Sequence, residues 1–337
     1  MSAISAGKLR GLLRLADARG FFTMLAVDQR PPIMNHLRSV QGDAPDAAVT
    51  AVKRTLLRNL GPGASAVLCD PVWAYPFAPE LVAPSQGLIV TLEDHRFEDT
   101  PGGRRATAIP GWSVEKIKRM GADGVKVLAH YRPDADPAVN AHQQDFVRGV
   151  GEDCRRFDLP FVFELLVYPL QGRAPDRLDD PDMHAALVLD SVRTFADPAY
   201  GVDVFKLESP IPAALVPDPD GAGAGAIQRH FDELGRLAGR PWVLLSAGAT
   251  AEAFARTLTF AARAGASGFL AGRAIWWQAF QHYPDLDAMA GALRADALPY
   301  MERLQALTAM HGRPWREGPI ELAAAGLDFP QRYGGMA

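Results

Sequence analysis

Cysteine is scarce in this chain, with only Cys69 and Cys154 among 337 residues. Two cysteines are too few for a disulfide framework or a cysteine-rich zinc site, and such low usage suits a reducing compartment. The sequence therefore predicts a cytoplasmic protein.

Long apolar runs and strong charge are also missing. No stretch reaches the roughly 18 uncharged apolar residues of a membrane span, and the N-terminus lacks the apolar core of a signal peptide. The formal net charge is only -4, without a long Lys/Arg run that could hold a phosphate backbone. We therefore expect no membrane association and no nucleic-acid partner.

Short apolar, β-prone runs recur along the chain, and a helical pattern follows most of them. This alternation is typical of parallel strands joined by crossover helices. The runs cover residues 22–28, 65–70, 88–93, 124–130, 161–168, 202–208, 242–248 and 268–273. Because eight such strands close a barrel, the sequence predicts an α/β fold of the (β/α)8 TIM-barrel type.

The helical patterns lie between these runs, at residues 44–60, 113–120, 137–157, 181–196, 225–238 and 250–264. An amphipathic helix at 1–18 is expected to close the barrel bottom, and 285–337 is expected to form a C-terminal helical extension. The Pro/Gly/Ala-rich stretch 210–225 is interpreted as a long loop. We expect one domain spanning residues 1–337.

A polar residue stands at or near the C-terminal end of each run. These residues are Asp28, Asp70, Glu93, Lys126, Glu164, Lys206, Ser246 and Arg273. Barrel enzymes build their active sites at that end of the strands. The sequence therefore predicts that a functional site draws on this set.

Two lysines lie within apolar sequence, Lys206 in Val-Asp-Val-Phe-Lys-Leu-Glu and Lys126 in Gly-Val-Lys-Val-Leu. Alternate barrel strands contribute to one interior layer, so the two amines are expected to face one another. Burial and a second nearby cation would each favour the neutral amine that attacks a carbonyl carbon. Lys206 is therefore a candidate nucleophile.

Glu164 and Asp28 are the carboxylates predicted to share this site. Glu164 lies on the run between the two lysines and could act as general acid and base, while Asp28 could orient substrate hydroxyls. The alternative is a buried salt-bridge network that satisfies only its own charges. The combination favours the catalytic interpretation, because buried ion pairs seldom improve stability.

The last two runs offer an anion site formed by Ser246, Gly248, Gly272 and Arg273. Glycines allow backbone N–H groups to approach phosphate oxygens, and barrels often hold a phosphate after strands seven and eight. The alternative is that these glycines only permit tight turns. Arg30 and Arg132 could bind a second anionic group, although each could equally be an ordinary surface arginine.

The histidines give no support for a metal site. His95, His130 and His142 lack metal-ligand spacing, and no compact His/Asp/Glu cluster is found in the sequence. A mechanism without metal or other cofactor is therefore expected.

Several segments resemble the tagatose-1,6-bisphosphate aldolases, which form Schiff bases. The matching segments are residues 25–30, 112–126, 163–166, 202–208, 245–248 and 271–274. Residues 22–30 and 265–273 also look like the related 6-deoxy-6-sulfofructose-1-phosphate aldolases, and Arg132 fits that relative better. Positions 96–110 and 171–180 match neither pattern.

This resemblance implies a class I lyase that reversibly cleaves a phosphorylated ketose to dihydroxyacetone phosphate and a three-carbon aldehyde. It implies Lys206 as the Schiff-base lysine, Glu164 as the proton-transfer residue and Lys126 and Asp28 as supporting residues. It also implies Ser246, Gly248, Gly272 and Arg273 around the C1 phosphate. A sugar phosphate is the expected partner, and a homo-oligomer is expected.

Other functions stay open at this point. The substrate could carry sulfonate at C6, which would give sulfolactaldehyde as the aldehyde product. A deoxyribose-phosphate or keto-acid aldolase would use the same lysine chemistry. A regulator that senses sugar phosphates without turnover is the alternative from another class.

Overall fold

The computed structural model describes residues 4–170, 178, 180–318, 322 and 326–333. Eight parallel strands close a barrel in the order β1-β10-β9-β8-β7-β6-β3-β2. Their bounds are β1 Phe22–Ala26, β2 Ala66–Cys69, β3 Gly87–Thr91, β6 Gly124–His130, β7 Phe161–Leu166, β8 Val204–Leu207, β9 Trp242–Leu244 and β10 Gly268–Ala271. The predicted (β/α)8 TIM barrel is confirmed, and each strand lies within its predicted run except β3, which begins one residue earlier at Gly87.

The lower barrel interior is apolar. Met24, Ile89, Val162, Val204 and Leu270 belong to one buried cluster and come from five different strands. A second, larger cluster fills the space between the outer strand faces and the helices. Burial on both faces explains why the strands read as nearly continuous apolar runs rather than as alternating ones.

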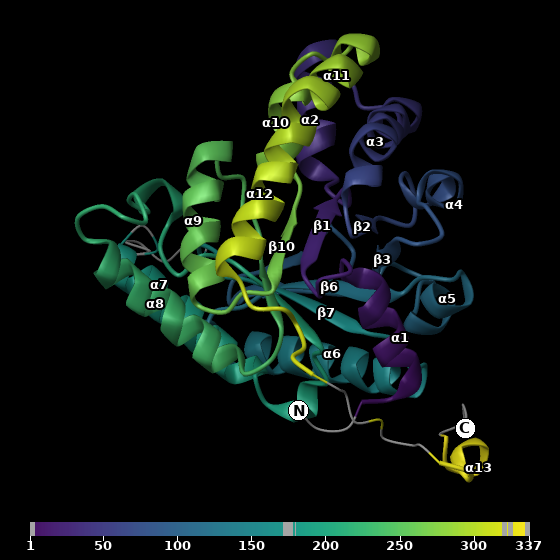
Figure 1. Ribbon diagram of the computed structural model, residues 1–337, viewed down its shortest axis with the longest axis vertical. Coiled ribbons are helices and arrows are strands. Elements are labelled where there is room, and N and C mark those ends of the chain that lie inside the picture. Colours follow the sequence, from purple (N-terminus) through teal and green to yellow (C-terminus); the bar gives the residue numbers. More distant parts are fainter. Residues whose placement is uncertain (1–3, 171–177, 179, 319–321, 323–325, 334–337) are drawn as a thin grey trace.

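Helices surround this barrel (Figure 1). The predicted crossover helices are found as α3 Asp46–Leu60, α5 Val114–Arg119, α6 Pro137–Arg156, α7 Pro181–Phe195, α8 Ala224–Ala238 and α9 Ala251–Arg263. Side-chain caps fix several of their starts; for example, Thr250 accepts the backbone N–H of Ala253. The predicted boundaries agree with these helices to within two residues.

The first helix and the segment around Trp315 pack together at the N-terminal end of the barrel. Helix α1, Ala6–Leu15, buries Leu12 and Leu15 against the interior cluster, which also contains Phe22 and Trp315. The helix expected at 1–18 corresponds in position to α1, and residues 1–3 lie outside the described residues. Helix α1 therefore closes the barrel bottom.

The C-terminal extension begins as a nearly continuous helix and then becomes irregular. It comprises α11 Leu286–Ala292, a π-helical turn η6 at Leu293–Ala297, α12 Leu298–His311 and the short α13 Phe329–Arg332. Helix α12 packs against α9, and α13 lies apart from the barrel (Figure 1). Residues 319–321, 323–325 and 334–337 of the predicted extension lie outside the described residues.

Several short elements were not predicted from the sequence. They are α2 Pro31–Gln41, α4 Ala78–Leu81, the 3-10 turns η1 Gly61–Gly63, η2 Tyr75–Phe77, η4 Pro198–Tyr200 and η5 Ala213–Leu215, and the antiparallel hairpin β4 Glu98–Thr100 with β5 Gly103–Arg105. Helix α10, Arg273–Phe280, follows β10 directly. Helix α2 buries only Ile33 and Leu37, so its apolar signal is weak. The hairpin follows β3 and precedes α5. None of the described helices is long and apolar enough to cross a membrane.

Candidate active site

A layer of charged side chains replaces the apolar interior at the C-terminal end of the strands. Glu164 on β7 is in register with Lys206 on β8 and with Leu128 on β6. Paired residues of parallel strands point to the same face, so Glu164 and Lys206 share the barrel interior. Lys126 lies two residues before Leu128 and points inward with them.

Glu164 joins the two lysines. Its Oε2 atom lies 2.9 Å from Nζ of Lys206 and 2.7 Å from Nζ of Lys126. Both amines are almost completely buried, with 3% and 2% of their surfaces exposed. The predicted meeting of the two lysines inside the barrel is therefore correct, and a shared carboxylate connects them.

Lys126 also contacts two further carboxylates. Its Nζ donates to Oδ2 of Asp28 at 2.9 Å and to Oε1 of Glu93 at 2.7 Å. Thr91 donates to the same Asp28 oxygen at 3.3 Å. Lys126 is thus the centre of a buried network, whereas Lys206 occupies its edge.

The charges of this network act on one another. Burial alone would lower the pKa of Lys126, but the charges of Asp28, Glu164 and Glu93 outweigh it and raise that pKa above its ordinary value. The expectation that the second lysine would favour a neutral amine is therefore wrong for Lys126. Three carboxylates surround it, so it stays a cation.

The three carboxylates differ in their environments. Burial would raise the pKa of Glu164, but Lys126 and Lys206 hold it below its usual value. The pKa of Asp28 is likewise lowered, because the charges of Lys126, Lys206 and Arg30 outweigh burial. The pKa of Glu93 is raised, because burial outweighs the attraction of Lys126 and Arg30.

The Ser246 segment makes a tight turn directly after β9. Ser246 is 8% exposed, and its carbonyl oxygen accepts the Ala249 N–H at 2.7 Å. Ala247 and Gly248 both have positive φ, at 44° and 83°. Such a turn exposes consecutive backbone N–H groups, an arrangement that suits an anion.

Arg273 lies against this turn. A Cβ added at Gly248 would stand 3.0 Å from Nη1 of Arg273, so the glycine gives the guanidinium its room. Gly272 directly precedes helix α10 and packs closely against β1, because a Cβ added to it would stand 2.5 Å from the Ala26 carbonyl oxygen. The four predicted anion-site residues therefore flank neighbouring strands β9 and β10.

Arg273 also interacts electrostatically with the two carboxylates that contact the buried lysines. Burial lowers the pKa of Arg273, and the charges of Glu164 and Asp28 partly oppose that shift. The guanidinium thus shares the barrel mouth with both carboxylates.

The other two predicted arginines are already engaged. Arg30 donates to the Glu93 carboxylate at 3.3 Å and to the Glu93 carbonyl at 3.2 Å. Arg132 binds Asp134 at 2.9 Å and the Tyr168 carbonyl at 3.1 Å. Both arginines are buried, so the interpretation as ordinary surface arginines is wrong.

Asp70 does not join the charged network. Its Oδ2 atom accepts a 2.6 Å hydrogen bond from Lys53 on α3, which is completely buried. Its Oδ1 accepts the backbone N–H groups of Val72 and Trp73. This carboxylate therefore ties β2 to a helix and to the following turn.

Glu208 is a carboxyl group that the sequence analysis did not single out as a site residue. It lies two residues beyond Lys206 and accepts the Val167 N–H at 2.5 Å. Burial raises its pKa to about 8, with a further contribution from the charge of Glu164. Its spacing from Lys206, two residues along one strand, was the available signal.

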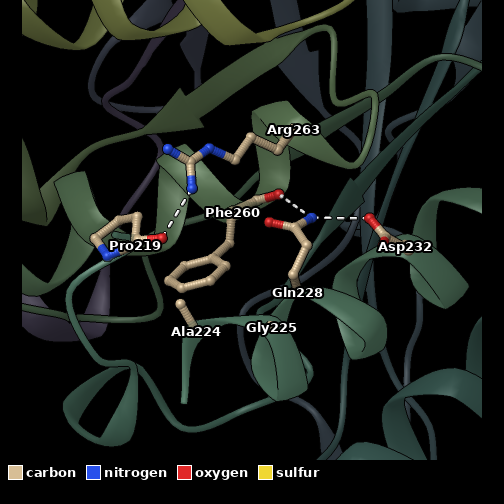
Figure 2. Close-up of a pocket in the computed structure, with 7 residues that line it drawn as sticks. All are labelled: Pro219, Ala224, Gly225, Gln228, Asp232, Phe260 and Arg263. Atoms are coloured by element: carbon tan, nitrogen blue, oxygen red, sulfur yellow. Dashed lines mark hydrogen bonds between the residues drawn. The ribbon is translucent and has the colours of Figure 1, made fainter. Parts of the chain in front are cut away.

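A cavity of about 400 Å³ lies elsewhere on the molecule (Figure 2). Helices α8 and α9 contribute Gln228 and Phe260 to it, and Arg263, which also lines it, donates to the Pro219 carbonyl at 2.9 Å. Its lining includes none of the charged residues of the barrel interior. It is therefore separate from the candidate site.

Comparison with known proteins identifies the family. The model of the DeoC/LacD family aldolases matches residues 22–278, which is well over half of the chain. This chain belongs to the DeoC/LacD aldolase family. The enzyme is thus an aldolase, a carbon–carbon lyase, and the resemblance found in its sequence is confirmed.

Curated relatives agree over nearly the whole length. Tagatose 1,6-diphosphate aldolase 2 of Enterococcus faecalis is 30% identical over 94% of this chain and 97% of its own. Tagatose 1,6-diphosphate aldolase of Listeria monocytogenes is 32% identical over 94% of this chain and 95% of its own.

Solved structures support the fold. An archaeal fructose 1,6-bisphosphate aldolase has a TM-score of 0.57 at 20% identity and covers 89% of this chain and 98% of its own. Fructose-bisphosphate aldolase from Plasmodium falciparum has a TM-score of 0.67 at 13% identity and covers 94% of this chain and 99% of its own.

Proposed function

We propose that this aldolase cleaves a phosphorylated ketose of the tagatose or fructose 1,6-bisphosphate type through a Schiff base on Lys206. The observation that carries the proposal is the contact between the buried Lys206 amine and Glu164, 2.9 Å apart inside the barrel. A neutral amine is needed for attack on a ketone, and the adjacent carboxylate can take its proton.

In the proposed reaction, Glu164 takes a proton from Lys206, and the neutral nitrogen adds to the C2 carbonyl carbon. Glu164 then returns the proton to the hydroxyl that departs as water, which gives an iminium ion and restores the Glu164 carboxylate. Glu164 then removes the proton of the C4 hydroxyl, directly or through a water molecule. The C3–C4 bond breaks, the iminium accepts the electron pair, and the aldehyde product departs. Protonation of the enamine at C3 and hydrolysis release dihydroxyacetone phosphate.

Lys126 and Asp28 have supporting roles in this proposal. A permanently charged Lys126, 2.7 Å from Glu164, favours the ionised form of that carboxylate, which the proton-transfer step requires. Asp28 is held by Lys126 and keeps a carboxylate at the barrel mouth for the substrate hydroxyls.

We assign the C1 phosphate to the corner formed by Ser246, Gly248, Gly272 and Arg273. The turn at Ser246–Ala249 and the start of helix α10 at Gly272 supply backbone N–H groups, and Arg273 supplies a planar cation suited to phosphate oxygens. The names of the curated relatives, which specify tagatose 1,6-diphosphate, support a substrate phosphorylated at both ends. A related structure described as Schiff-base-forming supports the covalent mechanism.

The test is to trap the intermediate with borohydride in the presence of dihydroxyacetone phosphate. Mass spectrometry of the digested protein is expected to find the adduct on the peptide containing Lys206. Lys206→Met should abolish both adduct and cleavage without unfolding the protein. An adduct on another lysine, or turnover retained in Lys206→Met, would refute the assignment.

A substrate panel separates the remaining candidates. We expect turnover of tagatose or fructose 1,6-bisphosphate; preferred turnover of 6-deoxy-6-sulfofructose 1-phosphate would instead assign a sulfonate at C6. Preferred turnover of deoxyribose phosphate or a keto acid would identify another Schiff-base lyase. Tight binding without turnover of any of these would favour the regulator.

We also propose that the enzyme acts in the cytoplasm. Both cysteines, Cys69 and Cys154, are free and buried, as is usual in a reducing compartment. Fractionation of the cells that make the protein tests this proposal.

A further inference from the structure

The rim of the barrel above the charged network carries a histidine that the proposed mechanism does not use. His130 ends β6 and is in register with Leu166 of β7, two residues beyond the pair of Leu128 and Glu164. Residues two apart on a strand share a face, so His130 points inward with Leu128 and Lys126 and lies two layers closer to the barrel mouth than Lys126.

The position of β6 in the barrel matters for a substrate charged at both ends. In the closed order of eight strands, β6 stands four places from β10, and β3 stands four places from β9. The proposed C1-phosphate corner lies at the ends of β9 and β10. Groups at the ends of β3 and β6 therefore face it across the mouth, where the far end of an extended ketose would arrive.

His130 has an unused polar atom at this place. Its Nε2 lies 3.5 Å from Nη1 of Arg104, and because a guanidinium can only donate, this contact favours the tautomer in which Nε2 accepts and Nδ1 carries the proton. Nδ1 is buried and has no hydrogen-bond partner among the residues that the structure describes. A buried donor without a partner is costly, and a ligand oxygen would satisfy it.

The β4–β5 hairpin brings Arg104 to the same point. The Arg104 N–H donates to the Tyr168 hydroxyl at 2.9 Å, and the guanidinium lies 5.5 Å above the Tyr168 ring centre. The guanidinium also contacts Asp99 of the hairpin at 2.9 Å. The side chains of Arg104 and Asp99 are 31% and 49% exposed, so this ion pair is solvated and weak.

Arg30 and Arg132 are less suited to a second substrate anion. The Arg30 guanidinium and its partner Glu93 are 6% and 0% exposed, so an anion would have to displace a fully buried carboxylate. Arg132 is 3% exposed and held by Asp134 and a carbonyl oxygen. Among the residues that the structure describes, the carboxylate that an anion reaching Arg104 would displace is the solvated Asp99.

We propose that Arg104 and His130 form the subsite for the anionic group at the substrate end opposite the C1 phosphate, either a phosphate or a sulfonate. This proposal rests on the proposed function. Arg104 supplies the cation and His130 supplies a neutral N–H donor from Nδ1. The hairpin thereby selects substrates charged at both ends.

The electrostatics of His130 agree with this role. Burial and then the charge of Arg104 lower its pKa to about 4, against an opposing effect of Glu164. The imidazole is therefore neutral near pH 7, and its unused nitrogen is a donor under assay conditions.

The experiment compares fructose 1,6-bisphosphate with fructose 1-phosphate, which lacks the second anion. Arg104→Gln is expected to lower kcat/KM at least about tenfold for the bisphosphate, because one charge-assisted hydrogen bond is lost. The same variant should lower kcat/KM less than about twofold for the monophosphate. His130→Phe, which keeps the ring against Phe97, should show the same selectivity. Asp99→Asn should lower KM for the bisphosphate, because it removes the competing carboxylate.

The matched control is Arg105→Gln. Arg105 is the next residue of the hairpin, and like Arg104 it is about one-third exposed (32%) and paired with a hairpin carboxylate, Glu98, at 3.8 Å. Because side chains alternate along a strand, Arg105 points to the face of the hairpin opposite Arg104. This control should change neither kcat/KM. The subsite is refuted if Arg104→Gln behaves like Arg105→Gln, or if it weakens both substrates equally.

Trapping with dihydroxyacetone phosphate distinguishes the two proposals, because that compound has no distal anion. If wild type forms no borohydride-stable adduct, the proposed function fails and the subsite with it. If wild type and Arg104→Gln form equal adduct but Arg104→Gln keeps the full preference for the bisphosphate, only the subsite fails. A sulfonate at the distal position is tested with 6-deoxy-6-sulfofructose 1-phosphate, for which the same loss in Arg104→Gln is expected.

Discussion

Replacing Lys126 by methionine should make the stability of the enzyme depend on pH in a defined way. Three carboxylates, Asp28, Glu93 and Glu164, contact Lys126 within 2.9 Å, and all lie inside the barrel. Methionine keeps most of the volume but removes the charge. One carboxylate is then expected to take up a proton in the folded state, because the remaining direct contacts, Lys206 with Glu164 and Arg30 with Glu93, pair only two of the three.

The magnitude follows from the cost of that proton. Keeping a carboxyl group protonated, when its pKa in the unfolded chain is near 4, requires about 1.4 kcal/mol of free energy for each pH unit above 4. Lys126→Met should therefore lose about 4 kcal/mol at pH 7 but only about 1.4 kcal/mol at pH 5. The sign follows from linkage: wild type holds the pKa values of Asp28 and Glu164 low, so their stabilisation is present at neutral pH and disappears in acid.

Urea unfolding followed by circular dichroism at pH 5 and pH 7 measures this difference. The double variant Lys126→Met/Glu93→Gln removes one negative charge as well, and should recover most of the loss at pH 7. An equal loss at both pH values, or a double variant no more stable than the single one, would show that the charge balance described here is wrong.

Two further predictions concern neighbouring parts of the site. Gly248→Ala should lower the free energy of unfolding by about 1–2 kcal/mol, because the residue has a φ of 83°. It should also raise KM for C1-phosphorylated substrates, because the new Cβ would stand 3.0 Å from Arg273. The control Gly121→Ala, at φ 89° in open space, should lower stability by a similar amount without changing KM. In wild type the pKa of Glu208 is raised to about 8 by folding, so the folded protein should lose stability as pH rises from about 4.5 to 8. Glu208→Gln removes this group, and the stability of the variant should therefore depend less on pH. Urea midpoints across pH 5–8 that fall equally in Glu208→Gln and wild type would contradict that origin.

The barrel itself could be predicted because its information is local. Each strand is a short run buried on both faces, and each crossover helix has its own apolar period, so neither depends on knowing the partner. Lys126, Glu164 and Lys206 were found for the same reason: a charge within such a run has no solvated alternative. The hairpin at Glu98–Arg105 was missed because its strands are three residues long and contain a single buried residue, Gly103, so they carry no apolar pattern.

What the sequence by itself determined is therefore the fold, the aldolase family and the layer of charged residues at the ends of the strands. Only the tertiary structure decided which charges meet: Asp70 pairs with Lys53 outside the network, Glu93 joins Lys126, and Arg104 reaches His130. The physical reason is the difference in sequence separation between the two kinds of information. Burial patterns repeat every two to four residues, whereas a Coulomb interaction depends on distances between atoms that folding brings together from far apart in the chain.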